Sequence, residues 1–366
     1  GAQIRLQRAR ITPRTIKTNK HRTNKTKPLL EVILDQNLYE KFSNTFQFVE
    51  TDDQLKVIEE GNTTTSANVL FDILRKIPSN TELNFTLKTE NKLSLKSENA
   101  DFNLLCLPTD NFPTFADEFE GQEISLNNDR LLKLLNKTKI SISNDDTRHY
   151  LNGIFLHLTE AHGRNFLTGV ATDSHRLSSS SLEVDKMNDF TSIILPRKTV
   201  FQLCSLLTEA KDSLTMQTSD NKIKFTLGSI KLISKVIDGK FPDYKKVVPT
   251  DNKKILSVVS KDFMSSIERV ITVSLDRKEG VKITLDKNNI QLFVNSSSSG
   301  EGKEILKANY GSEPLTVSFN SRYLLDIASE IGDQNLMMNL NDAISPVLIQ
   351  DKSDNHSFFD IMPMKI

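Results

Sequence analysis

The chain has 366 residues, of which 37% are hydrophobic, and its 47 Lys and Arg balance 47 Asp and Glu. This length allows two or three domains with cores of their own. No stretch approaches the ~20 apolar residues of a membrane helix. No secretory signal pattern stands near the start, and two cysteines are too few for a disulfide framework or a cysteine zinc site. These totals exclude membrane-spanning and disulfide-rich classes and predict a soluble cytoplasmic protein.

The neutral total hides an uneven distribution of charge. Residues 1–30 hold nine Lys and Arg and no acid, whereas the other 336 residues carry a net charge of −9. A basic run of this kind is most often a disordered arm. The alternative is a segment that contacts nucleic acid, and the sequence leaves both interpretations open.

One pattern of a helix followed by strands occurs three times. In each copy an amphipathic helix precedes strands of alternating polarity, at 67–78 before 83–97, at 197–207 before 214–227, and at 321–331 before 336–350. A second half also repeats, because the segments 126–143 and 259–275 each predict a short helix, with Asn127 or Ser260 as the N-cap candidate. The sequence therefore predicts an α+β fold of three similar domains, at 1–120, 121–248 and 249–366, rich in antiparallel sheet.

Basic side chains mark the predicted helices. In 128–139, Arg130, Lys133 and Lys137 follow the spacing i, i+3 and i+7, which places them on one face. Any single stripe of this kind is most often a solvated surface. Basic stripes on equivalent helices of a repeated unit within an acidic body instead indicate a concave surface that faces phosphates. No base-reading motif accompanies them, so such contacts would hold duplex DNA without sequence specificity.

The stretch "GVATDSHRLSSSS" (169–181) contains Asp173, His175 and several serines, and it raises the alternative of a hydrolase. Neighbours along a strand point to opposite faces, and no Gly-x-Ser-x-Gly elbow is present. Six histidines without a pair at ligand spacing give little support to a metal. We therefore expect neither a catalytic residue nor a metal or other cofactor here.

Several segments together resemble one family. "GVATDSHRLS", "ILPRK", "SKVIDGKFPDYKKVVP", "RHYLNGIFLHL" and the final "IMPMKI" are similar to signature segments of the bacterial sliding clamp, the beta subunit of DNA polymerase III, across about residues 60–366. The resemblance implies a homodimeric ring of three clamp domains per chain, with antiparallel sheets outside and helices lining a central hole threaded by duplex DNA. It implies a non-catalytic processivity factor that is associated with the nucleoid. An ATP-using clamp loader would place it on DNA.

The resemblance also implies a peptide pocket between domains 2 and 3. Its partners would be the alpha subunit of DNA polymerase III, the clamp loader, and other polymerases and repair proteins that carry a clamp-binding motif. The matching positions are Leu151, Thr172, His175, Arg176, Leu177, Pro242, Val247, Tyr323, Ile344, Met362, Pro363 and Met364. Arg176 and His175 would fix peptide carbonyls or carboxylates at the rim. Ser174, which stands where the family usually has Gly, adds a side chain to a turn that favours positive φ.

Further positions follow from the resemblance. DNA contacts are expected at Arg148, Tyr150 and Arg197, and the helix stripe adds Lys133 and Lys137. At the dimer interface, domain 1 of one chain would meet domain 3 of the other through Phe102, Leu104, Ile271, Thr272, Val273 and Glu304. Residues 1–55 show no family pattern, so either domain 1 has diverged or the basic run is a cloning or reading-frame artefact. A general adaptor that does not bind DNA is the third possible function.

Overall fold

The computed structural model describes nearly all residues from 123 onward and parts of the region before it. The described residues are 10–11, 15–17, 61–62, 64–78, 82–89, 91–107, 119, 123–185, 190–209, 213–219, 221–228, 230–274, 280–332 and 334–364. The interpretations of the basic run and of residues 1–55 therefore lie outside the described residues, apart from 10–11 and 15–17. The chain forms two compact units, Arg5–Asp117, and Glu118–Ile366 together with Gly1–Ile4.

In the unit Arg5–Asp117, one helix packs on an antiparallel sheet. The sheet has the order β2-β5-β6-β7-β4, formed by Thr15–Lys17, Glu82–Thr89, Lys92–Lys96, Asp101–Leu107 and Thr64–Thr65. The short strands β1 (Arg10–Ile11) and β3 (Gly61–Asn62) pair separately. Helix α3 (Ala67–Lys76) contributes Leu70 to a core that also holds Leu93 and Leu95 of β6. The helix and the strand pair predicted in this region are both confirmed.

The second unit contains two copies of one module. The first copy runs β8 (Glu123–Leu126), α4 (Asn128–Lys139), η2 (Asp146–Leu151), β9 (Gly153–Ala161), β10 (Arg164–Thr172), β11 (Arg176–Val184), β12 (Ile193–Pro196), α5 (Arg197–Glu209), β13 (Leu214–Ser219), β14 (Lys222–Leu227), β15 (Ile230–Lys235) and η3 (Tyr244–Lys246). The second runs β16 (Lys254–Val259), α6 (Ser260–Val270), η4 (Ile271–Val273), β17 (Gly280–Asp286), β18 (Asn289–Ser296), β19 (Gly300–Lys307), β20 (Asn309–Tyr310), β21 (Leu315–Asn320), α7 (Ser321–Ile331), β22 (Asn335–Leu340), β23 (Val347–Asp351) and β24 (Ser357–Ile361).

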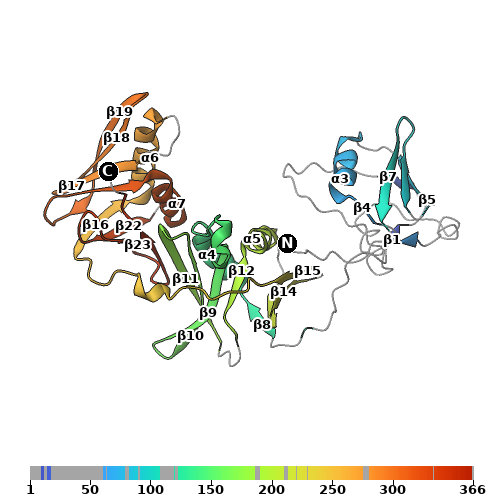
Figure 1. Ribbon diagram of the computed structural model, residues 1–366, viewed down its shortest axis with the longest axis horizontal. Coiled ribbons are helices and arrows are strands. Elements are labelled where there is room, and N and C mark those ends of the chain that lie inside the picture. Colours follow the sequence, from blue (N-terminus) through green and yellow to red (C-terminus); the bar gives the residue numbers. More distant parts are fainter. Residues whose placement is uncertain are drawn as a thin grey trace. The chain divides into compact units, whose positions relative to one another are not determined.

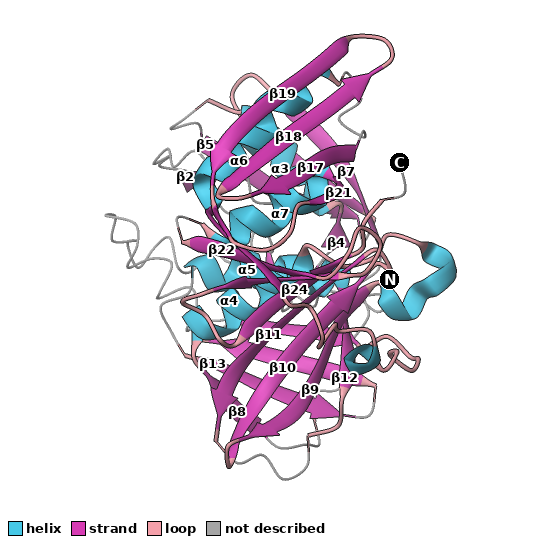
Figure 2. Cartoon of the chain, turned by 90° about the vertical axis from the view of Figure 1, so that its left-hand side faces the viewer, coloured by secondary structure: helices cyan, strands magenta, loops and turns pink. Residues whose placement is uncertain are grey.

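The strand orders show that the two copies are equivalent. The run β12-β9-β10-β11 in the first copy corresponds to β21-β17-β18-β19 in the second, and β8-β13-β14-β15 corresponds to β16-β22-β23-β24. The copies are joined because β11 pairs antiparallel with β24, which makes one nine-stranded sheet across both (Figure 2). The repeated α+β module with antiparallel sheets that the sequence predicts is thus confirmed in both copies.

Helices cover one side of this sheet system. Helix α6 packs on α7, α7 contacts α4, and α4 packs on α5, so the four lie in a row with the strands behind them (Figure 1). Each helix turns its apolar stripe to the sheets, as Leu131, Leu134 and Leu135 of α4 do. No helix among the described residues is long and apolar enough to cross a membrane.

The two predicted helix caps have different outcomes. The Asn127 side chain accepts a hydrogen bond from the Arg130 amide at 3.0 Å, so the predicted cap of α4 is confirmed. The prediction for Ser260 is wrong, because Ser260 is the first helical residue of α6. Its hydroxyl donates to the Ala328 carbonyl at 2.9 Å and thereby ties α6 to α7.

Candidate docking site and DNA-facing surface

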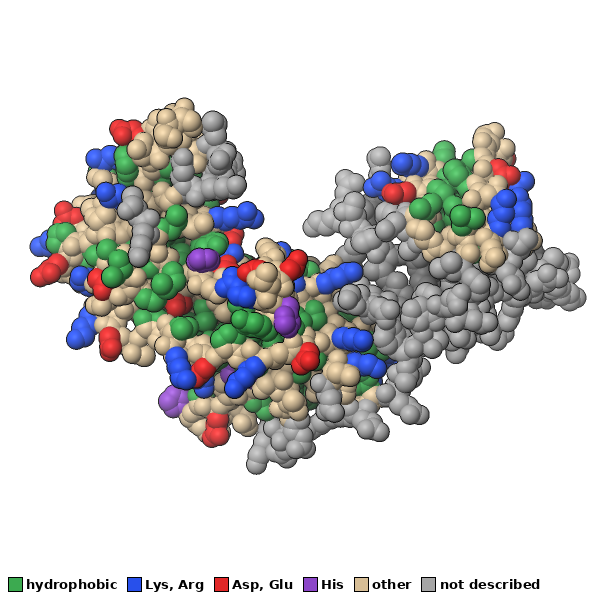
Figure 3. All heavy atoms as spheres, viewed as in Figure 1, with side chains coloured by type: hydrophobic (Ala, Val, Ile, Leu, Met, Phe, Trp, Pro, Cys, Tyr) green, Lys and Arg blue, Asp and Glu red, His purple; other side chains and the backbone are tan. Residues whose placement is uncertain are grey.

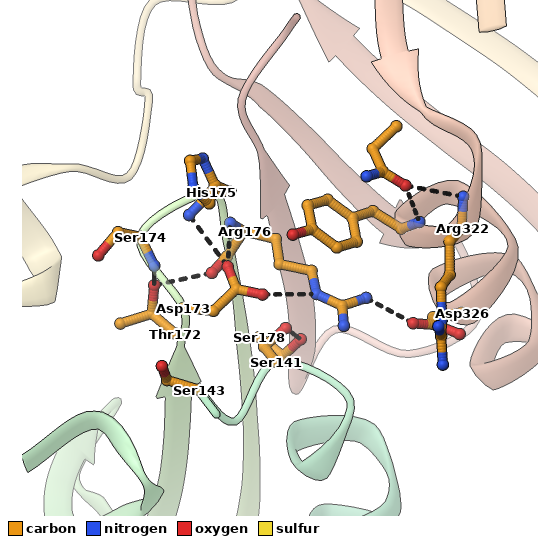
Figure 4. Close-up of polar contacts among 12 residues, drawn as sticks. Ser141, Ser143, Thr172, Asp173, Ser174, His175, Arg176, Ser178, Arg322 and Asp326 are labelled. Carbon is orange, nitrogen blue, oxygen red and sulfur yellow. Dashed lines mark hydrogen bonds and ion pairs between the residues drawn. The ribbon is translucent and has the colours of Figure 1, made fainter. Parts of the chain in front are cut away.

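The turn after β10 is held by its own side chains (Figure 4). Asp173 Oδ1 accepts from the backbone amides of His175 and Arg176, both at 3.0 Å. The Thr172 hydroxyl donates to the Arg176 carbonyl at 2.7 Å and accepts from the Ser174 amide. Ser174 has φ 75°, the left-handed conformation that we expected at this position. Asp173 is thus occupied in shaping the turn, and the His175 ring, which is exposed, makes no bond with it. The hydrolase alternative has no support in this geometry.

Arg176 links the two modules. Its Nε donates to Asp173 Oδ2 at 3.1 Å and its Nη1 to Asp326 Oδ2 of α7 at 2.7 Å. The guanidinium also lies over the Tyr323 ring, 4.2 Å from the centroid. The side chain is largely buried between these groups. Two of the five N–H donors of Arg176 are thus occupied by carboxylates, and its predicted role towards peptide carbonyls or carboxylates at the rim stays a prediction.

Four of the predicted pocket residues are apolar and exposed. The exposed fractions are 57% for Val247, 72% for Ile344, 43% for Met362 and 39% for Met364. The backbone brings the carboxyl-terminal segment to the turn, because the Met362 amide donates to the His175 carbonyl at 2.9 Å. We call Val247, Ile344, Met362 and Met364 the docking patch. Figure 3 shows apolar side chains reaching the surface of this unit among charged ones.

The other predicted pocket residues have different environments. Leu151 and Leu177 are buried in a small core with Phe241 and Tyr244, on the outer side of the nine-stranded sheet. Tyr323 and Pro363 are half-buried, and Pro242 is exposed. The predicted pocket residues therefore fall into a buried group and an exposed group. We call the core that contains Leu151, Leu177, Phe241 and Tyr244 the buried floor.

Sequence reasoning missed one residue of this floor, Asp360. It stands on β24 directly opposite Leu177, so the two side chains share one face of the sheet. The signal was present in "SFFDIM", since strand alternation puts Phe358, Asp360 and Met362 on one face.

Some of the predicted DNA-contact residues are exposed on the row of helices, and one of them is buried. Lys137 is only 4% exposed, and its ammonium lies 2.6 Å from Asp354 Oδ2 in the turn between β23 and β24. The prediction that Lys137 contacts DNA is therefore wrong. Lys133 also reaches Asp354, at 2.9 Å, but its side chain is 58% exposed. The helical spacing was correct, and the burial arises from the second module, which covers the carboxyl-terminal half of α4.

The remaining predicted DNA contacts have local partners. The Arg197 guanidinium, at the start of α5, lies over the exposed Phe201 ring, 5.4 Å from its centroid. Arg148 Nε donates to Asp145 at 2.9 Å and its Nη1 donates to the Ser174 hydroxyl at 2.5 Å. Tyr150 packs against the buried floor. Arg148 thus connects the proposed DNA side to the turn of the docking site.

The predicted interface residues are partly buried within their own domains. Leu104 on β7 and Ile271 in η4 belong to the cores of their own domains, so their side chains are not available to a partner, contrary to expectation. Phe102 and Val273 are half-buried, and Thr272 is exposed. Glu304 on β19 accepts hydrogen bonds from Arg269 at 2.6 Å and Ser266 at 2.8 Å, and the Arg269 bonds lower the pKa of Glu304.

Two exposed apolar residues on these strands were missed. Leu105 of β7 is 84% exposed and Ile305 of β19 is 61% exposed. In the sheet order, β19 is an edge strand. An exposed apolar residue on an open edge is typical of a strand that pairs with another chain. Among the described residues, no group of three or more His, Cys, Asp or Glu is arranged to hold a metal ion.

Comparisons with known proteins agree with this architecture. Family models match the N-terminal domain of the DNA polymerase III beta subunit over residues 30–116, its central domain over 125–243 and its C-terminal domain over 245–365. The first match includes residues 30–55, where the sequence alone showed no family pattern. The beta sliding clamp of Caulobacter vibrioides is 31% identical over 91% of this chain and 92% of its own, and that of Escherichia coli K12 is 29% identical over similar shares.

Solved structures give the same result. The sliding clamp of Bartonella birtlesii bound to griselimycin is 38% identical, with a TM-score of 0.78 over 84% of each chain. The beta sliding clamp of Caulobacter crescentus is 32% identical, with a TM-score of 0.80 over 85% of this chain and 83% of its own.

Proposed function

The chain belongs to the family of bacterial beta sliding clamps, the non-catalytic processivity subunit of DNA polymerase III, and we propose from this premise that two copies close around duplex DNA and dock partner proteins. The proposed domains are 1–120, 121–248 and 249–366. The observation that carries the proposal is the row of four helices backed by antiparallel sheets, with β19 as the open edge of the four-stranded sheet in the last module. Tethering raises the concentration of the polymerase at its template without any reaction.

The repeat itself supports ring closure. Within the chain, β11 of one module pairs with β24 of the next. In the last module, the equivalent of β11 is β19. In the first domain, the equivalent of β24 is β7, because both strands follow a helix and a two-stranded hairpin. Among the described residues β4 pairs with only Cys106 and Leu107 of β7. A β19–β7 contact between two copies, along the rest of β7, would repeat the internal joint, with Ile305 and Leu105 exposed on the two strands. A head-to-tail contact of this kind closes after two copies when its rotation is 180°.

The helix row supports the DNA role. Arg130 and Lys133 of α4 are exposed, and Arg197 stands at the start of α5. Long basic side chains opposite a phosphate backbone bind by releasing counterions, which holds the duplex without reading its sequence. Arg148 and Tyr150 extend this proposed surface. A protein that acts in this way would be found with the nucleoid.

The docking patch supports partner binding. Flexible methionine side chains beside Val and Ile form an adaptable apolar surface that accepts short peptides of differing sequence. We propose that this surface receives tails and loops of the polymerase alpha subunit, the clamp loader and repair proteins. A few anchors seated on it would provide most of the affinity.

The test is retention on DNA of different topology. The loaded protein should stay on a nicked circular plasmid and be lost when the plasmid is cut once, and its mass should be twice the chain's 41.4 kDa. An adaptor without a ring would show no dependence on circularity. Equal retention on circular and linear DNA would overturn the proposal.

A further inference from the structure

Asp360 is a carboxylic acid in an apolar place. Its neighbours on β24, Phe359 and Ile361, point into the core of the last module. Asp360 therefore points to the opposite face of the sheet, where Phe358 packs on the buried floor. Leu177 of β11 and Leu348 of β23 flank it directly. The residue is 5% exposed.

This carboxyl group is incompletely paired. Its Oδ1 has no hydrogen-bond partner within the part of the chain that the structure describes. Burial raises the pKa of Asp360 to about 7, and the amide of Ile361 lowers it only in part. A buried acceptor without a donor is unfavourable, and a ligand that supplies the donor removes that cost.

The charged groups on the surrounding elements do not neutralise it. Arg176 is held by Asp173 and Asp326. Asp243 pairs with Lys246, and Asp342 accepts from the backbone of its own turn. The other charged or titratable side chains nearby include His175, Lys240, Lys245, Asp251, Lys253 and Lys254, together with Tyr150 and Tyr244 of the buried floor, and none of them perturbs the pKa of Asp360. Oδ1 of the carboxyl group thus remains an acceptor without a donor.

We propose that Asp360 is a specificity-determining residue of the docking site, and that it selects peptides whose anchor side chain carries an N–H or O–H donor over peptides with a wholly apolar anchor. The inference rests on the proposed docking function. Met362, which follows the end of β24 and stands two residues after Asp360, belongs to the docking patch, so an anchor seated on it would come close to the carboxyl group. Oδ1 is already shielded from water, so an apolar anchor seated beside it would leave its hydrogen bond unmade, whereas a donor would complete it.

The chemistry predicts an order among anchors. A lysine or arginine anchor would form a charge-assisted hydrogen bond with ionised Asp360, and a glutamine, serine or threonine anchor would form a neutral or singly charged one. Leucine would be disfavoured relative to these. This order would reverse when the carboxyl group is replaced by an apolar side chain of similar size.

The experiment uses the full-length protein and a defined probe. The probe is the carboxyl-terminal decapeptide of the same organism's DNA polymerase III alpha subunit, with each position replaced in turn by Leu, Gln or Lys. Binding of each fluorescent peptide is measured by anisotropy to the wild type and to Asp360→Val. At one position the wild type should bind the Gln or Lys peptide about tenfold more tightly than the Leu peptide, and Asp360→Val should reverse this order.

A second variant separates charge from shape. Asp360→Asn keeps the size of the side chain and its acceptor, so it should keep the preference for Gln and lose the preference for Lys. Raising the pH from about 6 to about 8 should strengthen Lys binding to the wild type and not to Asp360→Asn, because only the wild type ionises there. His175 is present in both proteins, so its contribution cancels in the comparison.

The outcomes distinguish the two proposals. If wild type and Asp360→Val bind the peptides with the same ranking, the role of Asp360 is overturned and the docking site stands. If neither protein binds any peptide while both remain on circular DNA, the docking site itself is overturned, and the role of Asp360 with it.

Discussion

The ion pair between Lys137 and Asp354 joins the two modules of the second unit, and its removal should be costly. Both side chains are 5% exposed, and the ammonium and carboxylate lie 2.6 Å apart. The Asn in Asp354→Asn can still accept from the His356 amide, which now bonds Asp354 Oδ1 at 3.0 Å. The substitution therefore removes the charge and leaves the buried Lys137 without its hydrogen-bonded counterion. Breaking a buried pair in this way costs about 3–5 kcal/mol.

The assay is urea unfolding followed by circular dichroism, with thermal unfolding beside it. A loss of this size should lower the midpoint temperature by about 10 °C for a unit of this length. Lys133→Met is the matched control, because Lys133 contacts the same carboxylate from a largely exposed position. An exposed pair contributes less than about 1 kcal/mol, so the control should unfold nearly like the wild type.

A double variant tests the mechanism. Combining Asp354→Asn with Lys137→Met removes both charges, and it should recover most of the lost stability because an apolar replacement of a buried pair is close to neutral. If Asp354→Asn and Lys133→Met lose the same small amount, or if the double variant is no more stable than Asp354→Asn, the buried charge is not what holds the modules together.

The pH dependence follows from the same group. Burial alone would raise the pKa of Asp354, but the hydrogen bonds from Lys137 and Lys133 outweigh it and lower the pKa well below its usual range. The folded state thus binds this proton less readily than the unfolded chain does. The stabilisation is complete above the unfolded pKa of about 3.9 and is lost as the pH falls towards the folded pKa. Asp354→Asn should lack this acid-sensitive component.

Three other changes address the rest of the molecule. Asp360→Asn should stabilise the chain more at about pH 8 than at about pH 5, by roughly 2–3 kcal/mol, because a folded pKa of about 7 against about 3.9 unfolded makes the wild-type carboxyl group costly as the pH rises. An equal effect of the substitution on urea unfolding at the two pH values would contradict this. Arg197→Glu should weaken duplex binding and reduce the slope of log binding constant against log salt concentration by about 1. The control, Arg164→Glu in the β9–β10 hairpin, should change neither. Equal effects of the two substitutions would argue against a DNA role for α5. Deleting residues 362–366 should abolish binding of the polymerase-tail peptide and leave the mass in light scattering unchanged, and retained affinity would remove the docking patch from the site.

The local pattern of the sequence was sufficient for the modules and their helices. Alternation over 214–227 predicted the hairpin of β13 and β14, and the spacing of Leu131, Leu134 and Leu135 predicted the buried side of α4. These features depend on neighbours within a few residues, where strand and helix periods act directly. The Asn127 cap belongs to the same class.

Packing between residues far apart in the sequence could not be predicted from these local patterns. Lys137 shares a helical face with Arg130, yet it is buried because a turn more than 200 residues away carries Asp354. The same holds for Arg176, whose position in the turn was predicted but whose partner Asp326 on α7 was not. Periodicity identifies which residues share a face of a helix or strand. It does not predict which distant segment packs on that face.

The proposed ring needs two kinds of strand contact, β11 with β24 within the chain and β19 with β7 between copies. The strands of these two contacts differ in chemistry in a way that fits the proposal. Where β11 meets β24, two buried hydroxyls satisfy one another: Ser180 bonds Ser357 at 2.9 Å. Hydroxyls buried in this way would lose these partners if the joint opened, which favours a permanent contact. The equivalent edge strand β19 instead carries charged side chains, namely Glu301, Lys303, Glu304 and Lys307. Charges keep an open edge hydrated and prevent indiscriminate pairing. A ring that opens to admit DNA would expose the contact between copies repeatedly and the contact within the chain never. The charged strand β19 is therefore suited to the contact that opens. Strand β11, with its buried serines, is suited to the contact that stays closed.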